Sequence, residues 1–219
     1  MYRGRIIACI TNRRLVEGDF LAQIERVAAM EMVDWLIVRE KDLRAKEYRI
    51  LFAKVARIAH KGGKKCLAHG RIALSVMSEL GADGIHLPLD VLREWRAASG
   101  RRSALQAGAV QLVGASAHSA AEIAEAVALG ADYATLSPIF ATDCKPGAAP
   151  LGTAALAAAC KESPIPIFAL GGIGMDKLDA CIEAGAAGCC MMSELMRCIC
   201  SIRAVPLGLE FLKVHGTIK

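Results

Sequence analysis

Glycines and a serine follow two neighbouring apolar runs near the end of the chain, in a pattern suited to holding a phosphate. One run is followed by Gly171-Gly172-Ile173-Gly174, and the next, Gly188 to Met192, is followed by Ser193 at the start of a helical segment. Glycine lets backbone N–H groups approach an anion closely, and a helix N-terminus adds the positive end of its dipole. The pattern predicts a phosphate cup, with a simple tight turn as the alternative.

Two cations stand at the end of another apolar run, in Arg39-Glu40-Lys41-Asp42. Side chains alternate along an extended chain, so Arg39 and Lys41 project on one side while Glu40 points away. Two converging cations would hold a diphosphate or stabilise a diphosphate leaving group. An exposed charge cluster at a strand end is the alternative, and the spacing leaves it open.

A long loop follows the run Tyr133 to Ser137 and carries Thr142, Cys144 and Lys145. Loops of this length in compact domains are commonly lids or anion clamps. Lys145 would neutralise a phosphate from this loop. A solvated lysine is an equally good interpretation of the loop position alone.

Ser116 and His118 follow the run Val110 to Ala115. Ser116 would bind an anion, and His118 would act as an acid or base near neutral pH. Ser119 and Glu122 form the pattern of a capping box, however, and this favours a structural position for His118 at a helix start.

Further polar residues lie beside the third and fourth runs. His69 and Arg71 follow Lys65 to Ala68, and His86 is followed by Leu87-Pro88-Leu89-Asp90. Mg²⁺ in proteins takes carboxylates and several waters as ligands. Asp90 is the one carboxylate offered there, so the sequence predicts no metal site.

These residues belong to a chain in which short apolar runs alternate with helical segments. The eight runs are Arg5 to Thr11, Asp34 to Arg39, Lys65 to Ala68, Gly84 to Leu87, Val110 to Ala115, Tyr133 to Ser137, Pro166 to Leu170 and Gly188 to Met192. The clearest helical segments are Phe20 to Met30, Glu47 to Lys61, Ile72 to Leu80, Ala120 to Leu129, Thr153 to Lys161 and Met175 to Ala184. The alternation predicts one (β/α)8 barrel of parallel strands over residues 1–219, with a tail from about 204 to 219. A doubly wound open sheet is the alternative.

Composition narrows the class of partner. The net charge of +5 comes from 27 basic and 22 acidic residues spread along 219 positions, without a basic stripe interleaved with aromatics. A phosphorylated small molecule is therefore expected rather than nucleic acid. No apolar stretch is long enough for a membrane span or a signal peptide. Nine cysteines without a Cys-x-x-Cys spacing favour free thiols in a reducing cytoplasm, and a homo-oligomer is left open.

Over nearly its whole length the chain resembles the thiamine phosphate synthase and TenI family of barrels. The resemblance is carried by Val38 to Lys41, Gly81 to Leu87, Gly114 to Ser119, Gly130 to Tyr133, Pro138 to Lys145 and Ala169 to Ile173. It implies that a thiazole phosphate faces Thr142, Gly172, Met192 and Ser193, and that a pyrimidine diphosphate in the synthase branch faces Arg39, Lys41, Ser116 and Lys145. In that branch Mg²⁺ assists departure of diphosphate, and the thiazole nitrogen attacks.

The sequence departs from the synthase pattern on the pyrimidine and metal side. Ile37 replaces a Gln, His69-Gly70 replaces an Asn-Asp pair, and Pro88-Leu89-Asp90-Val91 replaces Gly-Gln-x-Asp. These departures are similar to the TenI branch, some of whose members aromatise a thiazole carboxylate phosphate by proton shuttling. Such tautomerases carry a His where this chain has Pro138.

The leading hypothesis from sequence is a TenI-like enzyme of thiamine biosynthesis that binds a thiazole phosphate and tautomerises it. His118 or His69 would carry the proton, with Arg39 and Lys145 as further catalytic groups and no cofactor. A divergent thiamine phosphate synthase, a thiamine-phosphate diphosphorylase using Mg²⁺, is the first alternative. The second is a non-catalytic sensor of a phosphorylated ligand.

Overall fold

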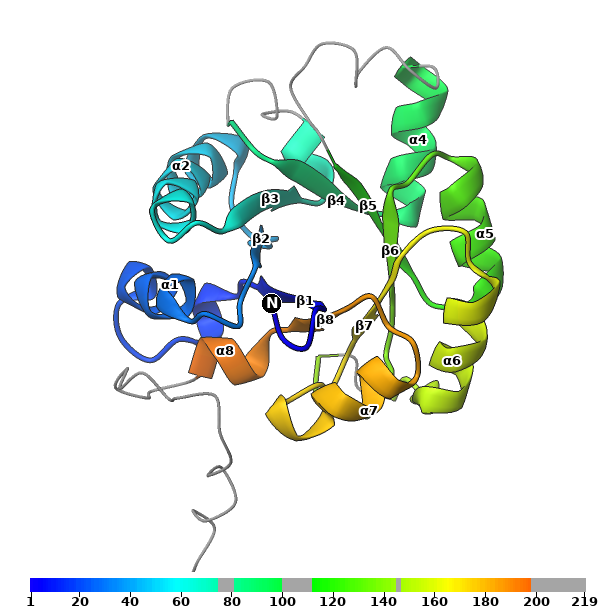
Figure 1. The fold of residues 1–219 in the computed structure, drawn as a ribbon. Helices are drawn as coiled ribbons and strands as arrows, with labels where there is room; N and C mark the ends of the chain where they lie inside the picture. The colour runs from blue at the N-terminus through cyan, green and yellow to red at the C-terminus, as the bar shows by residue number, and fades with distance from the viewer. Residues whose placement is uncertain (75–80, 100–111, 145–146, 198–219) are drawn as a thin grey trace, which may run out of the picture.

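Eight parallel strands close into a barrel in chain order in the computed structural model (Figure 1). The structure describes residues 1–74, 81–99, 112–144 and 147–197. The strands are β1 (Ile6–Ile10), β2 (Trp35–Val38), β3 (Lys65–His69), β4 (Gly84–Pro88), β5 (Val113–Ala117), β6 (Tyr133–Leu136), β7 (Ile167–Leu170) and β8 (Gly188–Met191). The ring is completed by the pairing of β8 with β1, in which Ala8 lies beside Cys190. The predicted (β/α)8 barrel is confirmed, and the open-sheet alternative is wrong.

Helices cover the outside of this ring (Figure 1). They are α1 (Phe20–Ala29), α2 (Ala45–Lys61), α4 (Leu89–Ser99), α5 (Ala120–Ala128), α6 (Gly152–Glu162), α7 (Leu178–Glu183) and α8 (Ser193–Arg197), with short 3₁₀ turns η1 (Arg13–Leu15) and η2 (Met175–Lys177). In the described ranges, no helix combines the length and the apolar character needed to cross a membrane. The end of the predicted segment Ile72 to Leu80 and the tail expected at about 204–219 lie outside the described residues.

Two element boundaries differ from the sequence interpretation. The fifth strand was expected to end at Ala115 but extends to Ala117, so Ser116 lies inside β5. Small residues have weak strand propensity, and pairing with β4 and β6 on both sides overrides it here. The fourth run was expected to end at Leu87, with no helix among the clearest predicted segments after it, whereas β4 extends to Pro88 and α4 begins directly at Leu89. Proline has a fixed φ that suits the entry to a helix.

Aromatic rings fill the inside of the barrel toward the N-terminal ends of the strands. Trp35 stacks on Phe168 with ring centroids 5.2 Å apart, and Tyr133 lies 4.9 Å from Phe168 and 5.4 Å from Trp35. Gly114 makes room for them, because a Cβ there would lie 2.2 Å from the Tyr133 ring. This plug closes the interior, so a ligand can enter only from the C-terminal end of the strands.

The cysteines of the strands are part of the core. Cys9, Cys66 and Cys189 are fully buried, as expected for small hydrophobic side chains. All seven cysteines in the described ranges are free thiols. They contribute packing rather than cross-links.

Candidate active site

Glu40 fixes the loop that carries the two predicted cations. It is only 3% exposed. Its Oε1 accepts hydrogen bonds from Thr11 Oγ1 at 2.8 Å and from the backbone N–H of Arg13 at 3.1 Å, and its Oε2 accepts one from Arg13 Nη1 at 3.0 Å. The backbone N–H of Arg39 donates to Thr11 Oγ1 at 3.0 Å. Glu40 is therefore held on the β1 side, and the β2 loop is locked to the end of β1.

Asp42 is also engaged with partners other than Arg39 and Lys41. Arg13 donates to Asp42 Oδ1 at 2.7 Å, and Arg14 donates to Asp42 Oδ2 at 2.8 Å. The hydrogen bonds from Arg13 hold the pKa of this carboxyl well below its usual range. Within the described ranges neither Arg39 nor Lys41 has an ion pair.

Tyr48 holds the ends of β2 and β3 together. Its buried hydroxyl donates to the Val38 carbonyl at 2.8 Å and accepts from the backbone N–H of His69 at 3.0 Å. Arg39 directly follows Val38, so this contact brings the cationic loop and His69 to the same part of the barrel mouth.

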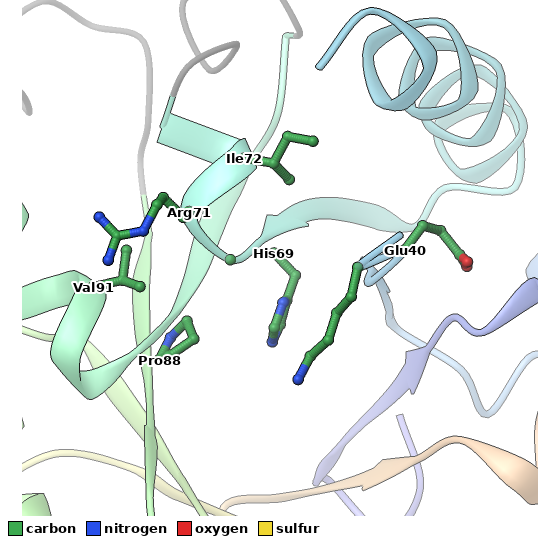
Figure 2. Close-up of a pocket in the computed structure, with 8 residues that line it drawn as sticks. Glu40, His69, Arg71, Ile72, Pro88 and Val91 are labelled. Carbon is green, nitrogen blue, oxygen red and sulfur yellow. The ribbon is translucent and has the colours of Figure 1, made fainter. Parts of the chain in front are cut away.

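A cavity of about 530 Å³ opens at this place, lined by Glu40, Lys41, His69, Gly70, Arg71, Ile72, Pro88 and Val91. Figure 2 shows the His69 ring projecting into it, while the Glu40 side chain turns away from it. Pro88 forms the β4 side of the opening (Figure 2). The predicted substrate-binding residues Lys41 and His69 thus share one pocket.

The charges around this pocket influence one another. The neighbouring Arg39 guanidinium and partial burial lower the pKa of Lys41. Burial lowers the pKa of Arg39. Burial, the ring of His86 and the two cations hold the pKa of His69 well below its ordinary value. His69 is therefore a neutral imidazole beside two positive charges, which is an arrangement that favours an anionic ligand.

Beneath His69 lies a buried polar chain. The rings of His69 and His86 stack with centroids 5.5 Å apart. His86 Nε2 hydrogen-bonds Ser116 Oγ and His86 Nδ1 hydrogen-bonds Tyr133 OH, both at 2.9 Å. Burial lowers the pKa of His86 to about 4. Ser116 is consequently joined to a neutral histidine, and its hydroxyl is oriented by that ring.

Thr135 adds an unpaired hydroxyl next to this chain. It is fully buried, and its Oγ1 has no hydrogen-bond partner among the residues that the structure describes. Tyr133 lies in the inner cluster and alternate strand residues share a face, so Thr135 also faces the barrel interior, beside its register partner Ser116. A buried hydroxyl without a partner is typical of a place where a ligand or water binds.

His118 lies between the last residue of β5 and the N-cap of α5. Its Nδ1 hydrogen-bonds the Ser137 carbonyl at 2.7 Å, and its backbone N–H donates to Glu122 at 2.7 Å. Ser119 Oγ accepts from the backbone N–H of Glu122 at 3.2 Å. The predicted helix start is confirmed, and His118 connects the β5 and β6 ends.

The glycine turn after β7 approaches the β6 loop very closely. Gly171 and Gly172 have φ values of +98° and +64°. A Cβ at Gly172 would lie 2.2 Å from the Ala141 carbonyl oxygen. Lys177 donates to the Gly172 carbonyl at 2.9 Å. The carbonyl is thus bonded on one side, while the backbone N–H groups of Gly172 and Ser193 make no hydrogen bond within the described ranges. Unpaired N–H groups at two adjacent strand ends are what the predicted phosphate cup requires.

The β6 loop reaches this cup. Thr142 Oγ1 accepts from the backbone N–H of Cys144 at 3.3 Å, and Cys144 Sγ lies 4.0 Å from Ser193 Oγ. Thr142 and Ser193 are therefore in neighbouring segments, and Met192 packs against the inner core. Lys145, a predicted catalytic and binding residue, lies outside the described residues.

The pocket does not fit a Mg²⁺ ion. Glu40 is the one carboxylate among its lining residues, and both of its oxygens bond to Thr11 or Arg13. Asp90 is exposed on α4. Across the described ranges, no cluster of three or more His, Cys, Asp or Glu side chains forms a metal site. Hard divalent cations take carboxylate and water oxygens rather than ammonium neighbours.

Some supporting residues were missed by sequence reasoning. Tyr48 lies on α2, Tyr133 lies at the start of β6, and Lys177 lies in η2. None of the three directly follows an apolar run. Their partners are distant along the chain or are backbone atoms. For Tyr133, the one local signal of a functional role was a hydroxyl-bearing side chain at the start of an otherwise apolar strand.

Comparisons with known proteins agree with this geometry. The model of the thiamine monophosphate synthase family matches residues 7–195. A protein of Geobacter sulfurreducens, provisionally named a thiamine-phosphate synthase, is 36% identical over 189 residues, covering 85% of this chain and 84% of its own. The thiamine-phosphate synthase of Syntrophomonas wolfei is 32% identical over 188 residues, covering 85% and 86%.

A solved structure shows the same fold. The thiamine phosphate pyrophosphorylase from Pyrococcus furiosus superposes with a TM-score of 0.71 at 21% identity, covering 90% of this chain and 89% of its own. Because the family model and the relatives span almost the whole barrel, the chain belongs to the thiamine monophosphate synthase family.

Proposed function

We propose that this chain is a transferase that joins a phosphorylated thiazole to a pyrimidine diphosphate, giving thiamine phosphate and free diphosphate. The observation that carries the proposal is that two separate places at the barrel mouth carry groups suited to an anion. One is the cup at the ends of β7 and β8, where the backbone N–H groups of Gly172 and Ser193 make no hydrogen bond within the described residues, and the other is Lys41 in the pocket beside β3 and β4, with Arg39 next to it. Two phosphorylated substrates need two such sites.

The proposed reaction is a substitution at carbon, with one reactant held at each of the two places. The thiazole nitrogen forms a bond to the methylene carbon of the pyrimidine while the bond from that carbon to the diphosphate oxygen breaks. The electron pair of the broken bond leaves with the diphosphate. Arg39 and Lys41 stabilise the negative charge that develops there, and the cup orients the thiazole phosphate.

This proposal reverses the order of the hypotheses drawn from sequence. A tautomerase acts on one thiazole carboxylate phosphate, whose second anionic group is a single carboxylate and calls for less positive charge than a diphosphate does. The names of the relatives in Geobacter sulfurreducens and Syntrophomonas wolfei also favour the synthase. The branch within the family is not distinguished by these comparisons.

Tautomerisation of a thiazole carboxylate phosphate is the second candidate, and His69 is the observation that favours it. Its ring lines the pocket beside Lys41, where a bound ligand would meet it. His118 is the other possible proton carrier, because its Nδ1 donates to the Ser137 carbonyl and this fixes the tautomer in which Nε2 is the basic nitrogen.

The test is to incubate the purified chain with thiazole phosphate and pyrimidine diphosphate, with and without Mg²⁺, and to measure thiamine phosphate. Product formation supports the transferase. If none forms, the conversion of thiazole carboxylate tautomers is followed by ultraviolet absorbance. Acceleration there establishes the second candidate, and ligand binding without either reaction leaves a sensor.

The proposal extends to partners and compartment. Its partners are phosphorylated small molecules, and free thiols at all seven described cysteines fit a reducing cytoplasm.

A further inference from the structure

The pocket beside β3 and β4 contains cations where a metal-dependent diphosphate site would need carboxylates. Lys41 lines it, as does Arg71, whose guanidinium is paired with the Glu94 carboxylate, and Arg39 lies close enough to Lys41 to lower the pKa of that ammonium. The neutral ring of His69 adds a hydrogen-bonding group without adding negative charge.

The one carboxylate in the lining is not able to turn inward without breaking its network. Glu40 is 3% exposed and accepts hydrogen bonds from Thr11 Oγ1 at 2.8 Å and from Arg13 Nη1 at 3.0 Å. Thr11 also accepts the backbone N–H of Arg39 at 3.0 Å. Turning Glu40 toward the pocket would leave a buried hydroxyl unpaired and release the loop that positions Arg39.

A divalent metal in this pocket would add two positive charges beside Arg39 and Lys41, and the described lining has no carboxylate free to hold it, because both Glu40 oxygens are already bonded. A diphosphate brings negative charge that both cations are able to partly neutralise directly. The described lining thus offers the anion positive charge and offers a metal ion no free carboxylate.

We infer that Lys41 in this pocket and the neighbouring Arg39 bind the diphosphate group directly, without a divalent metal ion. The inference rests on the proposed function, because it assigns the leaving group of that reaction to this pocket. It differs from the Mg²⁺ requirement that resemblance to the synthase branch implied.

Calorimetric titration of the full chain with inorganic diphosphate tests the inference. Binding is expected in the presence of EDTA, and Mg²⁺ is expected not to raise the affinity. Lys41→Ala should weaken binding about 10- to 100-fold, which is the loss of one charge-assisted hydrogen bond. Lys54→Ala removes the same charge from an exposed site on α2 and should leave the affinity unchanged. Binding that requires Mg²⁺, or no binding under either condition, overturns the inference.

Gly70 allows the missing carboxylate to be restored. It lines the pocket with φ at +82°, and a Cβ there meets nothing within 4 Å. Asp and Asn both tolerate this backbone region. Gly70→Asp should weaken metal-free diphosphate binding and make it increase with Mg²⁺, whereas the uncharged control Gly70→Asn should do neither. Equal behaviour of the two variants would contradict the charge argument.

Failure of the inference is distinguishable from failure of the proposed function. Metal-free diphosphate binding without formation of thiamine phosphate would retain the inference and reject the transferase. Thiamine phosphate formed together with diphosphate binding that needs Mg²⁺ would retain the transferase and reject the inference.

Discussion

The two halves of the barrel mouth present different chemical groups, one backbone N–H groups and the other side chains. The cup at β7 and β8 presents backbone N–H groups, and its shape depends on Gly171 and Gly172 fitting under the β6 loop. The pocket beside β3 and β4 presents side chains, held by Thr11, Glu40 and Tyr48. A backbone site resists change, because most substitutions at the glycines disrupt it. A side-chain site is altered by a single substitution, so its metal requirement can differ among proteins that share the cup.

The largest effect is expected from breaking the cup with Gly172→Ala. The new Cβ would lie 2.2 Å from the Ala141 carbonyl oxygen at a φ of +64°. Overpacking and the left-handed backbone together should lower the free energy of unfolding by about 4 kcal/mol. Thiazole phosphate binding should be lost, as measured by calorimetry, and stability should be measured by urea denaturation.

Gly18→Ala is the matched control for this variant. Gly18 has φ at +93°, and a Cβ there meets nothing within 4 Å. It should cost about 1 kcal/mol from the backbone alone and leave binding intact. Similar losses in both variants would mean that the close approach to the β6 loop is not what constrains Gly172.

Arg39→Ala removes one of the two positive charges of the side-chain half. Its guanidinium lies beside Lys41 with no ion pair in the described ranges, so its removal takes away charge aimed at the leaving group. Formation of thiamine phosphate should fall about 100- to 1,000-fold in kcat/KM. Thiazole phosphate binding at the cup should change little, and a large loss there would contradict the separation into two halves.

The two halves should also differ in their response to pH, because only the side-chain half rests on buried histidines. His86 has a pKa of about 4 in the folded chain against an ordinary value of 6.5. Its contribution to stability is present in full above pH 6.5 and is lost as the pH falls to about 4, since the unfolded chain takes up the proton first. This amounts to about 3 kcal/mol.

The check is the pH profile of the free energy of unfolding for the wild type and for His86→Gln. The variant keeps polar groups near Ser116 but does not titrate, so its profile should be flatter between pH 6.5 and 4. Parallel profiles would show that His86 is not a neutral ring in the folded protein. An NMR titration of the His86 imidazole in the wild type gives the same answer without a substitution.

The smallest effect is expected from Lys177→Met. Lys177 donates to the Gly172 carbonyl at 2.9 Å and orients the turn without being part of it. Loss of this hydrogen bond should weaken thiazole phosphate binding about tenfold. Lys161→Met, at an exposed position on α6, should leave that binding unchanged. Diphosphate binding should be unaffected in both variants.

The sequence by itself determined the barrel, and it also predicted the glycine turn at which we place the phosphate cup. Eight apolar runs with helical segments between them are a local pattern, and parallel strands joined in this way have few arrangements available. Gly171 and Gly172 mark a turn because glycine, having no Cβ, adopts a positive φ without steric strain. Alternation along the strand also separated Glu40 from Arg39 and Lys41, and the hydrogen bonds of Glu40 to β1 agree with it.

Only the tertiary structure decided how the side-chain half is assembled. His86 bonds Tyr133 and Ser116, which lie 47 and 30 positions away along the chain. Nothing in the sequence around Gly114 indicates that this residue makes room for the Tyr133 ring, 19 positions later. Ser116 was expected just after the fifth strand, whereas it lies within β5. These contacts depend on strand register and on the packing of side chains inside a closed ring, and neither is encoded in the neighbours of a residue. The same closure decided that Glu40, the one carboxylate among the described lining residues of the pocket, bonds to Thr11 and Arg13 and is not free to bind a metal ion.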